Sequence, residues 1–395
     1  MATTERTSVG TIDDLHASAT KLCGLDDFGD SSADNYLEGL EVLLDSYHRE
    51  AGLTPMGRSI KRAFLRGALV ARALSEQGWK DNPHYADVQI ERPIFVTGLP
   101  RTGTTALHRL LTADPAHQGL ELWLTEVPQP RPPRETWVQN PVFQGIEAGY
   151  RRHHIDNPEF MGLHYMSADD VEECWQLLRQ SITSISYESL ALVPSYSRWL
   201  QAQNWAAAYA RHKRNLQLIG LPDAEKRWVL KNPSHLFALD ELFEIYPDAL
   251  VIQTHRDPAT AMASVCSLNA QATVGWSTAF VGGAIGRSQL DLWSRGLSTF
   301  TQARRGRRSE QIVDVDYSAF VSDPIGTVAS IYDRIGIDFT DAARAAMTTM
   351  NQAGRSGDRR PAHRYSLADF GLTHRDIEAR FPHGTTGTGS TDAAD

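Results

Sequence analysis

The sequence predicts an α/β protein whose core is a P-loop-type, doubly wound parallel sheet flanked by helices. Four short runs have the apolar composition of buried strands, at 93–98, 227–231, 250–254 and 311–315. A helical pattern follows each run, and strands that alternate with helices in this way form parallel sheets. Ligands on such sheets bind at the carboxyl ends of the strands, so the residues that follow each run are the first candidates for a site.

The chain before the first strand has a helical pattern. From Thr11 to about Trp79, apolar residues recur at helical spacing, with breaks at 24–29 and 52–55. We interpret residues 1–90 as an N-terminal helical layer that packs on the α/β domain. This layer stabilises the domain in the simplest interpretation, and it also offers a candidate surface for a homodimer.

The α/β domain is expected to span residues 91–383. Gln118 to Trp123 is predicted to form a further short strand, and residues 140–220 are predicted to form a helical insert. An insert of this length between parallel strands usually carries substrate specificity. The tail at 384–395 has low complexity and is expected to be disordered. The helices expected after the later strands span 235–246, 258–269 and 318–335.

Composition excludes several classes of protein. The net charge of −9 argues against a nucleic-acid partner, and no apolar run is long enough for an integral membrane segment. The first twenty residues lack the apolar centre of a secretory signal. Three widely separated cysteines argue against a disulfide framework, so we expect a cytoplasmic protein. No metal-binding motif is present.

The stretch after the first strand has the features of a phosphate-binding turn. Gly98 and Gly103 bracket a tight turn, and Thr104 and Thr105 open an amphipathic helix. Free N–H groups and the positive end of the helix dipole bind anions at such a turn. The glycine spacing matches a P-loop, but Thr104 occupies the position of the Walker lysine and the cation is Arg101, inside the loop. The loop therefore suits a phosphate-like group but lacks the lysine that handles a triphosphate with magnesium.

The motif from Pro100 to Thr105 resembles the sulfate-side loop of sulfotransferases that use 3′-phosphoadenosine 5′-phosphosulfate (PAPS). It is similar to the bacterial branch and, at this loop, to the tyrosylprotein sulfotransferases. The resemblance runs from about Tyr36 to Leu372, but only a few motifs in it are specific. It implies that PAPS is the co-substrate and that no metal is needed. The loop residues that it assigns to PAPS are Arg101, Thr102, Gly103, Thr104 and Thr105.

Two further segments are candidates for the 3′-phosphate. In sulfotransferases an arginine at a strand end and a serine eight residues later bind this group, and Arg256 and Ser264 match that pattern. A guanidinium and a hydroxyl suit a dianionic phosphate, although a surface salt bridge is the alternative for Arg256. Tyr317 is a candidate nucleotide contact or an aromatic residue at the edge of the core. The basic segment 354–365, which includes Arg364, is a candidate lid or a solvated loop.

Lys231 ends its strand, where the resemblance implies that it bridges the sulfuryl group and the leaving phosphate. A surface lysine is the alternative. His235 follows in the same motif and could cap a helix, support a ligand or act as a base.

Sulfuryl transfer to a hydroxyl requires a base that takes its proton. The resemblance to the tyrosylprotein-like branch favours Glu121, with a surface carboxylate as the alternative. Many bacterial relatives instead place a glutamate directly after a tryptophan, whereas Leu124 follows Trp123 here. The rival bases are Glu126, His164 and His235.

Together these motifs predict a sulfotransferase that moves the sulfuryl group from PAPS to a hydroxyl or amine of an acceptor. A P-loop small-molecule kinase and a non-catalytic nucleotide-binding protein are the alternatives. The acceptor is open: a small molecule, a glycan, a lipid, a phenol or a peptide all fit the motifs.

Overall fold

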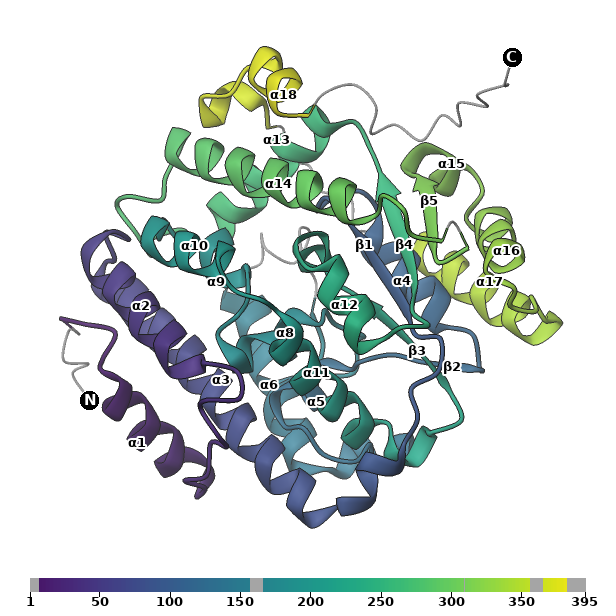
Figure 1. Cartoon of the computed structure of the whole chain (residues 1–395), viewed down its shortest axis with the longest axis horizontal. Coiled ribbons are helices and arrows are strands. Elements are labelled where there is room, and N and C mark those ends of the chain that lie inside the picture. Colours follow the sequence, from purple (N-terminus) through teal and green to yellow (C-terminus); the bar gives the residue numbers. More distant parts are fainter. Residues whose placement is uncertain (1–6, 157–165, 309, 356–364, 382–395) are drawn as a thin grey trace.

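The computed structural model describes residues 7–156, 166–308, 310–355 and 365–381. Within them, five parallel strands form one sheet in the order β2-β3-β1-β4-β5 (Figure 1). Helices pack on both faces of this sheet, so the doubly wound α/β fold predicted from the sequence is confirmed. The strands are β1 (Ile94–Gly98), β2 (His117–Gln118), β3 (Arg227–Lys231), β4 (Leu250–His255) and β5 (Ile312–Asp316).

The central strand, β1, is buried along its whole length. Successive side chains of a strand point to opposite faces of the sheet. Accordingly, Phe95 packs into one core cluster, whereas Ile94 and Val96 pack into a second cluster on the other face. A strand that is covered on both faces has a uniformly apolar sequence, which is the pattern that identified this segment.

Helices follow the strands as the alternation predicted. Asp257 caps the helix after β4, because its side chain accepts a hydrogen bond from the Thr260 N–H and Pro258 begins the first turn. The helices after the strands are α4 (Thr104–Thr112), α5 (Leu122–Glu126), η5 (Pro233–Phe237), α12 (Leu239–Ile245), α13 (Pro258–Ala272), α14 (Gly283–Ala303), α15 (Tyr317–Ser322), α16 (Pro324–Ile335), α17 (Asp341–Arg355), η6 (Leu367–Phe370) and α18 (His374–Arg380).

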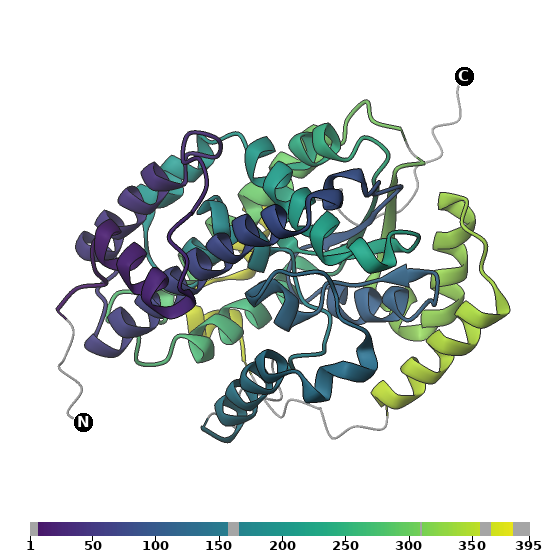
Figure 2. The same ribbon diagram turned by 90° about the horizontal axis from the view of Figure 1, so that it is seen from below.

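The remaining helices belong to the N-terminal segment and to the connection between β2 and β3. The N-terminal helices and α15 to α17 lie at opposite ends of the molecule (Figure 2).

No helix in the described ranges combines the length and the apolar character needed to cross a membrane. The N-terminal helices are α1 (Ile12–Cys23), α2 (Tyr36–Arg49), α3 (Pro55–Asp81) and η1 (Pro83–Asp87). Those of the connection are η2 (Arg134–Gln139), α6 (Pro141–Asp156), α8 (Trp175–Leu178), η3 (Arg179–Ser181), α9 (Ser186–Ser189), α10 (Pro194–Gln201), α11 (Ala206–Ile219) and η4 (Leu221–Asp223).

One predicted strand is wrong over most of its length. Of the segment from Gln118 to Trp123, only Gln118 belongs to a strand, and α5 begins at Leu122. The N–H groups of Leu122 and Trp123 donate to the carbonyl oxygens of Asp170 and Ala168, not to β3. The chain therefore leaves the sheet after β2, and its backbone bonds to a loop that is distant in the sequence. The local apolar pattern gives no information about such a distant partner.

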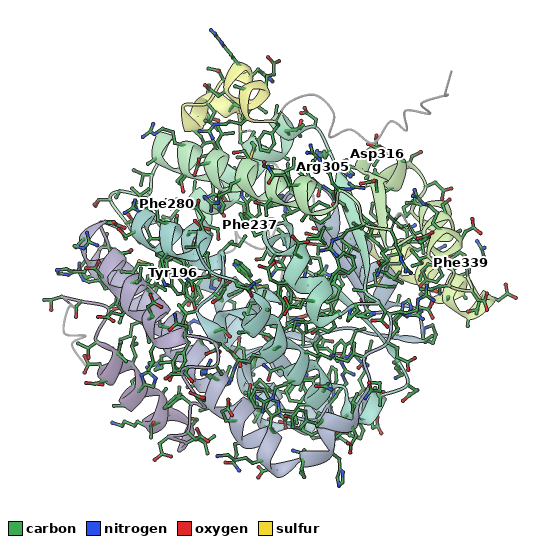
Figure 3. All side chains as sticks on the ribbon, viewed as in Figure 1. Tyr196, Phe237, Phe280, Arg305, Asp316 and Phe339 are labelled. Atoms are coloured by element: carbon green, nitrogen blue, oxygen red, sulfur yellow. The ribbon has the colours of Figure 1, made fainter. Side chains whose placement is uncertain are left out.

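Buried charges connect α3 to the helices of the β2–β3 connection. The Arg72 guanidinium pairs with Asp34 at 2.5 Å and also donates to the Gln180 carbonyl oxygen. Both partners of the ion pair are almost fully buried, and removal of one partner of such a pair is strongly destabilising. Tyr196 and Phe280 are fully buried among the side chains between the N-terminal helices and α14 (Figure 3).

Lys61, on α3, is a buried amine in an aromatic environment. Its Nζ donates to the Leu190 carbonyl oxygen at 2.9 Å and lies within 6 Å of the ring centroids of Tyr47, Phe64 and Trp276. No ion pair to a carboxylate involves it within the described part of the chain. Burial lowers the pKa of Lys61 to about 7.

This burial makes stability depend on pH. In the unfolded chain a lysine stays protonated up to about pH 10, so above pH 7 the unfolded state binds more protons at Lys61 than the folded state. The free energy of unfolding of the wild type should therefore rise by about 1.5 kcal/mol relative to Lys61→Met between about pH 7 and about pH 8.5. Urea unfolding of both proteins at the two pH values measures this difference. Parallel pH profiles would show that Lys61 stays charged in the folded protein.

Candidate functional site

The carboxyl ends of the central strands open into a cavity of about 1610 Å³. The loop between β1 and α4 forms one wall, together with the residues that follow β3 and β4. The opposite walls come from α3, α6, α8, α9 and α13. The cavity therefore joins the predicted phosphate loop to the N-terminal helices and to the β2–β3 connection.

The backbone of the loop requires its two glycines. Gly98 has a φ of 143° and Gly103 a φ of 90°. Residues with a Cβ rarely adopt backbone conformations with such positive φ angles. A Cβ on Gly98 would also lie 2.6 Å from the Thr254 carbonyl oxygen. Thr102 closes the turn, since its hydroxyl lies 2.6 Å from both the Leu99 carbonyl oxygen and the Thr254 hydroxyl.

Arg101 is held at the centre of this loop in a left-handed conformation, with a φ of 71°. The Arg256 guanidinium donates to the Arg101 carbonyl oxygen at 2.9 Å and stacks on the Tyr317 ring at 4.2 Å. The Nε of Arg101 in turn donates to the Ser264 hydroxyl at 3.1 Å. The fold thus brings four predicted residues, from three separate motifs, into one group. The Tyr365 hydroxyl joins them, at 3.0 Å from the Ser264 hydroxyl.

The strand end before Arg256 is fixed by a charged network. The His255 Nε2 lies 2.6 Å from Asp314 on β5, and Arg304 pairs with the same carboxylate at 2.8 Å. Burial would raise the pKa of Asp314, but the hydrogen bonds from His255 and Arg304 outweigh it and lower the pKa. Arg256 therefore projects from a rigid strand end.

Lys231 lies on the other side of the loop and pairs with Glu173. Its Nζ donates to the Glu173 carboxylate at 2.5 Å and to the Thr105 hydroxyl at 3.3 Å. Lys231 is only 2% exposed, whereas Glu173 and Thr105 line the cavity. The N–H of Cys174 donates to the Lys231 carbonyl oxygen, which fixes Glu173 beside the end of β3.

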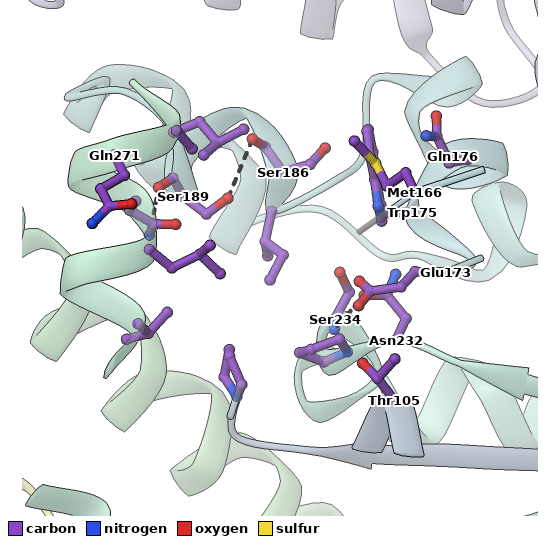
Figure 4. A pocket seen from close by; sticks show the side chains of 18 of the residues that line it. Thr105, Met166, Glu173, Trp175, Gln176, Ser186, Ser189, Asn232, Ser234 and Gln271 are labelled. Carbon is purple, nitrogen blue, oxygen red and sulfur yellow. Dashed lines mark hydrogen bonds between the residues drawn. The ribbon is translucent and has the colours of Figure 1, made fainter. Parts of the chain in front are cut away.

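Asn232 and Ser234 complete this part of the wall. Both are buried and line the cavity (Figure 4). The Asn232 Nδ2 and the Ser234 Oγ have no hydrogen-bond partner among the described residues. Buried polar atoms are normally paired, so these two are available to a bound molecule.

Glu121 does not line the cavity. It stands at the N-cap position of α5 without a capping hydrogen bond from its side chain, and it accepts a hydrogen bond from Arg131 at 3.1 Å, in a buried ion pair. Burial raises the pKa of Glu121, and Arg131 opposes that shift. A base must reach the proton that it takes, so we look for the base elsewhere.

His235 also lies in the core, away from the cavity wall. Its Nδ1 lies 2.6 Å from the Tyr209 hydroxyl, and its ring packs edge-on against Phe95. Burial lowers the pKa of His235 well below its usual value, so the ring is neutral. The rival Glu126 does line the cavity, where it accepts a hydrogen bond from Tyr150 at 2.6 Å.

Two of the predicted residues, His164 and Arg364, lie outside the described residues, as does most of the candidate lid. Among the residues that are described, no group of His, Cys, Asp and Glu side chains is arranged to hold a metal ion.

Glu173 is the cavity residue that the motifs missed. In the sequence, Glu173 is marked only by the acidic run at 169–173. A run of acidic residues is common on protein surfaces, and its distance along the chain from the phosphate loop does not identify it as part of the site. Asn232 and Ser234 lie in the same motif as Lys231 and His235, which were the two residues of it that were predicted for the site.

The comparisons with known proteins agree with this architecture. Residues 93–341 match the model of the Sulfotransferase family. The crystal structure of sulfotransferase STF1 from Mycobacterium tuberculosis H37Rv is 60% identical, with a TM-score of 0.89, over 95% of this chain and 100% of that chain. The structure of sulfotransferase STF9 from Mycobacterium avium is 26% identical, with a TM-score of 0.85, over 96% of each chain.

A curated relative from Mycobacterium bovis is named omega-hydroxy-beta-dihydromenaquinone-9 sulfotransferase Stf3. It is 25% identical over 261 residues. The match spans 62% of this chain and 63% of that protein, so it leaves over a third of the relative unmatched.

The geometry of the loop can be tested through Gly98. Gly98→Ala should destabilise the protein by about 2–3 kcal/mol, because the added Cβ strains the backbone and meets the Thr254 carbonyl. Gly145→Ala, on α6, is a matched control because nothing lies within 4 Å of its new Cβ. Denaturant unfolding of both variants measures the effect. A loss for Gly98→Ala no larger than that of the control would contradict the geometry.

Proposed function

The chain belongs to the sulfotransferase family, and on this premise we propose that it transfers the sulfuryl group of PAPS to a hydroxyl or amine of an acceptor bound in the cavity. The observation that carries the proposal is the pair of Lys231 and Glu173, which meets the predicted phosphate loop at Thr105. A cation and a carboxylate at one wall of a cavity supply the two groups that such a displacement needs.

In this proposal the loop from Arg101 to Thr105 binds the 5′-phosphosulfate of PAPS, through its N–H groups and the start of α4. Arg256 and Ser264 bind the 3′-phosphate, and Tyr317 supports the Arg256 guanidinium by stacking. These cations oppose the overall charge of −9 with a local positive field suited to a polyanionic donor. The scheme uses no metal.

The chemical step is an in-line displacement. The bond between sulfur and the bridging oxygen of the 5′-phosphate breaks while the acceptor oxygen bonds to sulfur. Lys231 stabilises the charge that develops on the leaving phosphate. Glu173 takes the acceptor proton, and its ion pair with Lys231 holds the carboxylate at the cavity wall, beside the site of transfer. Asn232 and Ser234 orient the acceptor through their unpaired polar atoms.

Three cysteines without disulfide bonds support a further part of the proposal, namely that the enzyme works in a reducing compartment such as the cytoplasm.

The base is tested by comparing two glutamates. Glu173→Gln should lower kcat by about 10²- to 10⁴-fold, with the affinity for 3′-phosphoadenosine 5′-phosphate nearly unchanged. Glu121→Gln is the matched control and should keep its kcat, because Glu121 does not line the cavity. Turnover is measured with an acceptor identified by screening with labelled PAPS. A fully active Glu173→Gln variant would exclude Glu173 as the base.

The donor site is tested by nucleotide discrimination. Arg256→Ala should weaken the binding of PAPS by about 2–5 kcal/mol, with much less effect on adenosine 5′-phosphosulfate, which lacks the 3′-phosphate. Calorimetry in the presence of EDTA measures both affinities and also tests whether a metal is needed. Arg198→Ala, on α10, is the control. Equal losses for the two nucleotides would show that Arg256 does not contact the 3′-phosphate.

A further inference from the structure

One part of the cavity has an apolar wall. Aliphatic and aromatic side chains from α3, from α13 and from the segments after α9 and α13 form it, namely Ile60, Phe64, Leu190, Val265, Leu268 and Trp276. Met56 and Val274 also line the cavity, and they are 55% and 68% exposed. An apolar wall that continues to exposed apolar residues suits a ligand with a long hydrocarbon part.

Arg179 is a charged residue in the wall of this cavity, in contrast to the apolar residues just described. It lines the cavity and is only 7% exposed. Its guanidinium lies over the Trp175 ring at 5.4 Å, and its Nε has no hydrogen-bond partner within the described part of the chain. None of the ion pairs among the described residues involves it. A buried guanidinium without an anion is costly, so this position favours a ligand that supplies one.

Gln176 lies one turn before Arg179, at the spacing that places two side chains on the same face of a helical segment. It lines the cavity, is 3% exposed, and its Oε1 lacks a partner among the described residues. In Figure 4 Gln176 lies beyond Trp175, on the side away from Glu173 and Thr105. The two unpaired groups therefore belong to the cavity but not to the cluster proposed for catalysis.

A glycine of α3 lies beside Arg179 at the cavity wall. Gly67 lines the cavity, and a Cβ at this position would lie 4.0 Å from the Arg179 Nη2. The other nearby acid on the wall, Glu126, is already hydrogen-bonded to Tyr150. No ion pair joins Glu126 or any other carboxylate of the described residues to Arg179.

From these observations we infer that Arg179 and Gln176 bind an anionic, oxygen-rich group of an otherwise apolar acceptor, such as the carboxylate of a hydroxylated lipid acid. This inference rests on the proposed function and specifies the class of its acceptor. The apolar body of the acceptor lies against α3 and α13, its anionic group pairs with Arg179, and its hydroxyl reaches Glu173. A neutral alcohol of the same length leaves the Arg179 charge unpaired and is the poorer substrate.

The test compares ω-hydroxy fatty acids with 1-alkanols of the same lengths, from octyl to hexadecyl, as acceptors for labelled PAPS. The wild type should prefer the acid over its matched alkanol by about tenfold or more in kcat/KM for at least one chain length. Arg179→Gln should abolish this preference, mainly through KM, whereas Arg179→Lys, which keeps the charge, should retain part of it. Arg198→Gln, on the exposed side of α10, should leave the preference intact. Equal use of acids and alkanols by the wild type would overturn the inference.

A binding measurement separates this inference from the proposed function. Fatty acids without a hydroxyl, of the same lengths, are titrated into the protein by tryptophan fluorescence, with and without 3′-phosphoadenosine 5′-phosphate. The wild type should bind them about tenfold or more tightly than Arg179→Gln. Equal binding by the two proteins, or no binding by the wild type, would refute the anionic subsite. Calorimetry with the nucleotide on the same samples reports on the proposed function, because a protein that binds no nucleotide would refute that function whatever its affinity for fatty acids.

Discussion

The parallel pairing of β1 with both β3 and β4 is the constraint on which the site depends. The register places Val96 opposite Lys231 and Gly98 opposite Thr254. In a parallel sheet the carboxyl ends of neighbouring strands meet at one edge, so the loop after Gly98, the Lys231 ammonium and the Arg256 guanidinium must converge there. A change in register by one residue would turn each side chain to the opposite face of the sheet and separate these groups.

The connection between β2 and β3 adds what the sheet edge cannot supply. Glu173 is carried to Lys231 by backbone hydrogen bonds, from the Cys174 N–H to the Lys231 carbonyl and from the Glu172 N–H to the Leu120 carbonyl. These bonds anchor an otherwise irregular segment beside the end of β3. The same connection continues into α8 and η3, and so places Arg179 in the cavity only a short distance along the chain from the proposed base.

Among the N-terminal helices, α3 closes the cavity from the other side. α3 contributes apolar residues and Gly67 to its wall, and the buried Arg72–Asp34 pair fastens α3 to Gln180, the residue that follows Arg179. We propose that this layer belongs to the acceptor site and does not serve for stability alone.

The sequence by itself determined the parallel α/β fold and the elements at the sheet edge. Strands β1, β3, β4 and β5 and the glycine turn follow from short-range properties, namely burial periodicity, left-handed glycine backbone and the Asp257 cap. The tertiary structure alone decided which carboxylate faces the cavity. The sequence does not distinguish Glu121 from Glu173, because both are glutamates with no local feature that marks a base. Non-local hydrogen bonds lead the chain out of the sheet after Gln118. They bury Glu121 against Arg131 and place Glu173 beside Lys231. The unpaired state of Arg179 is likewise invisible in the sequence, because it depends on what surrounds the side chain in space and not on its neighbours along the chain.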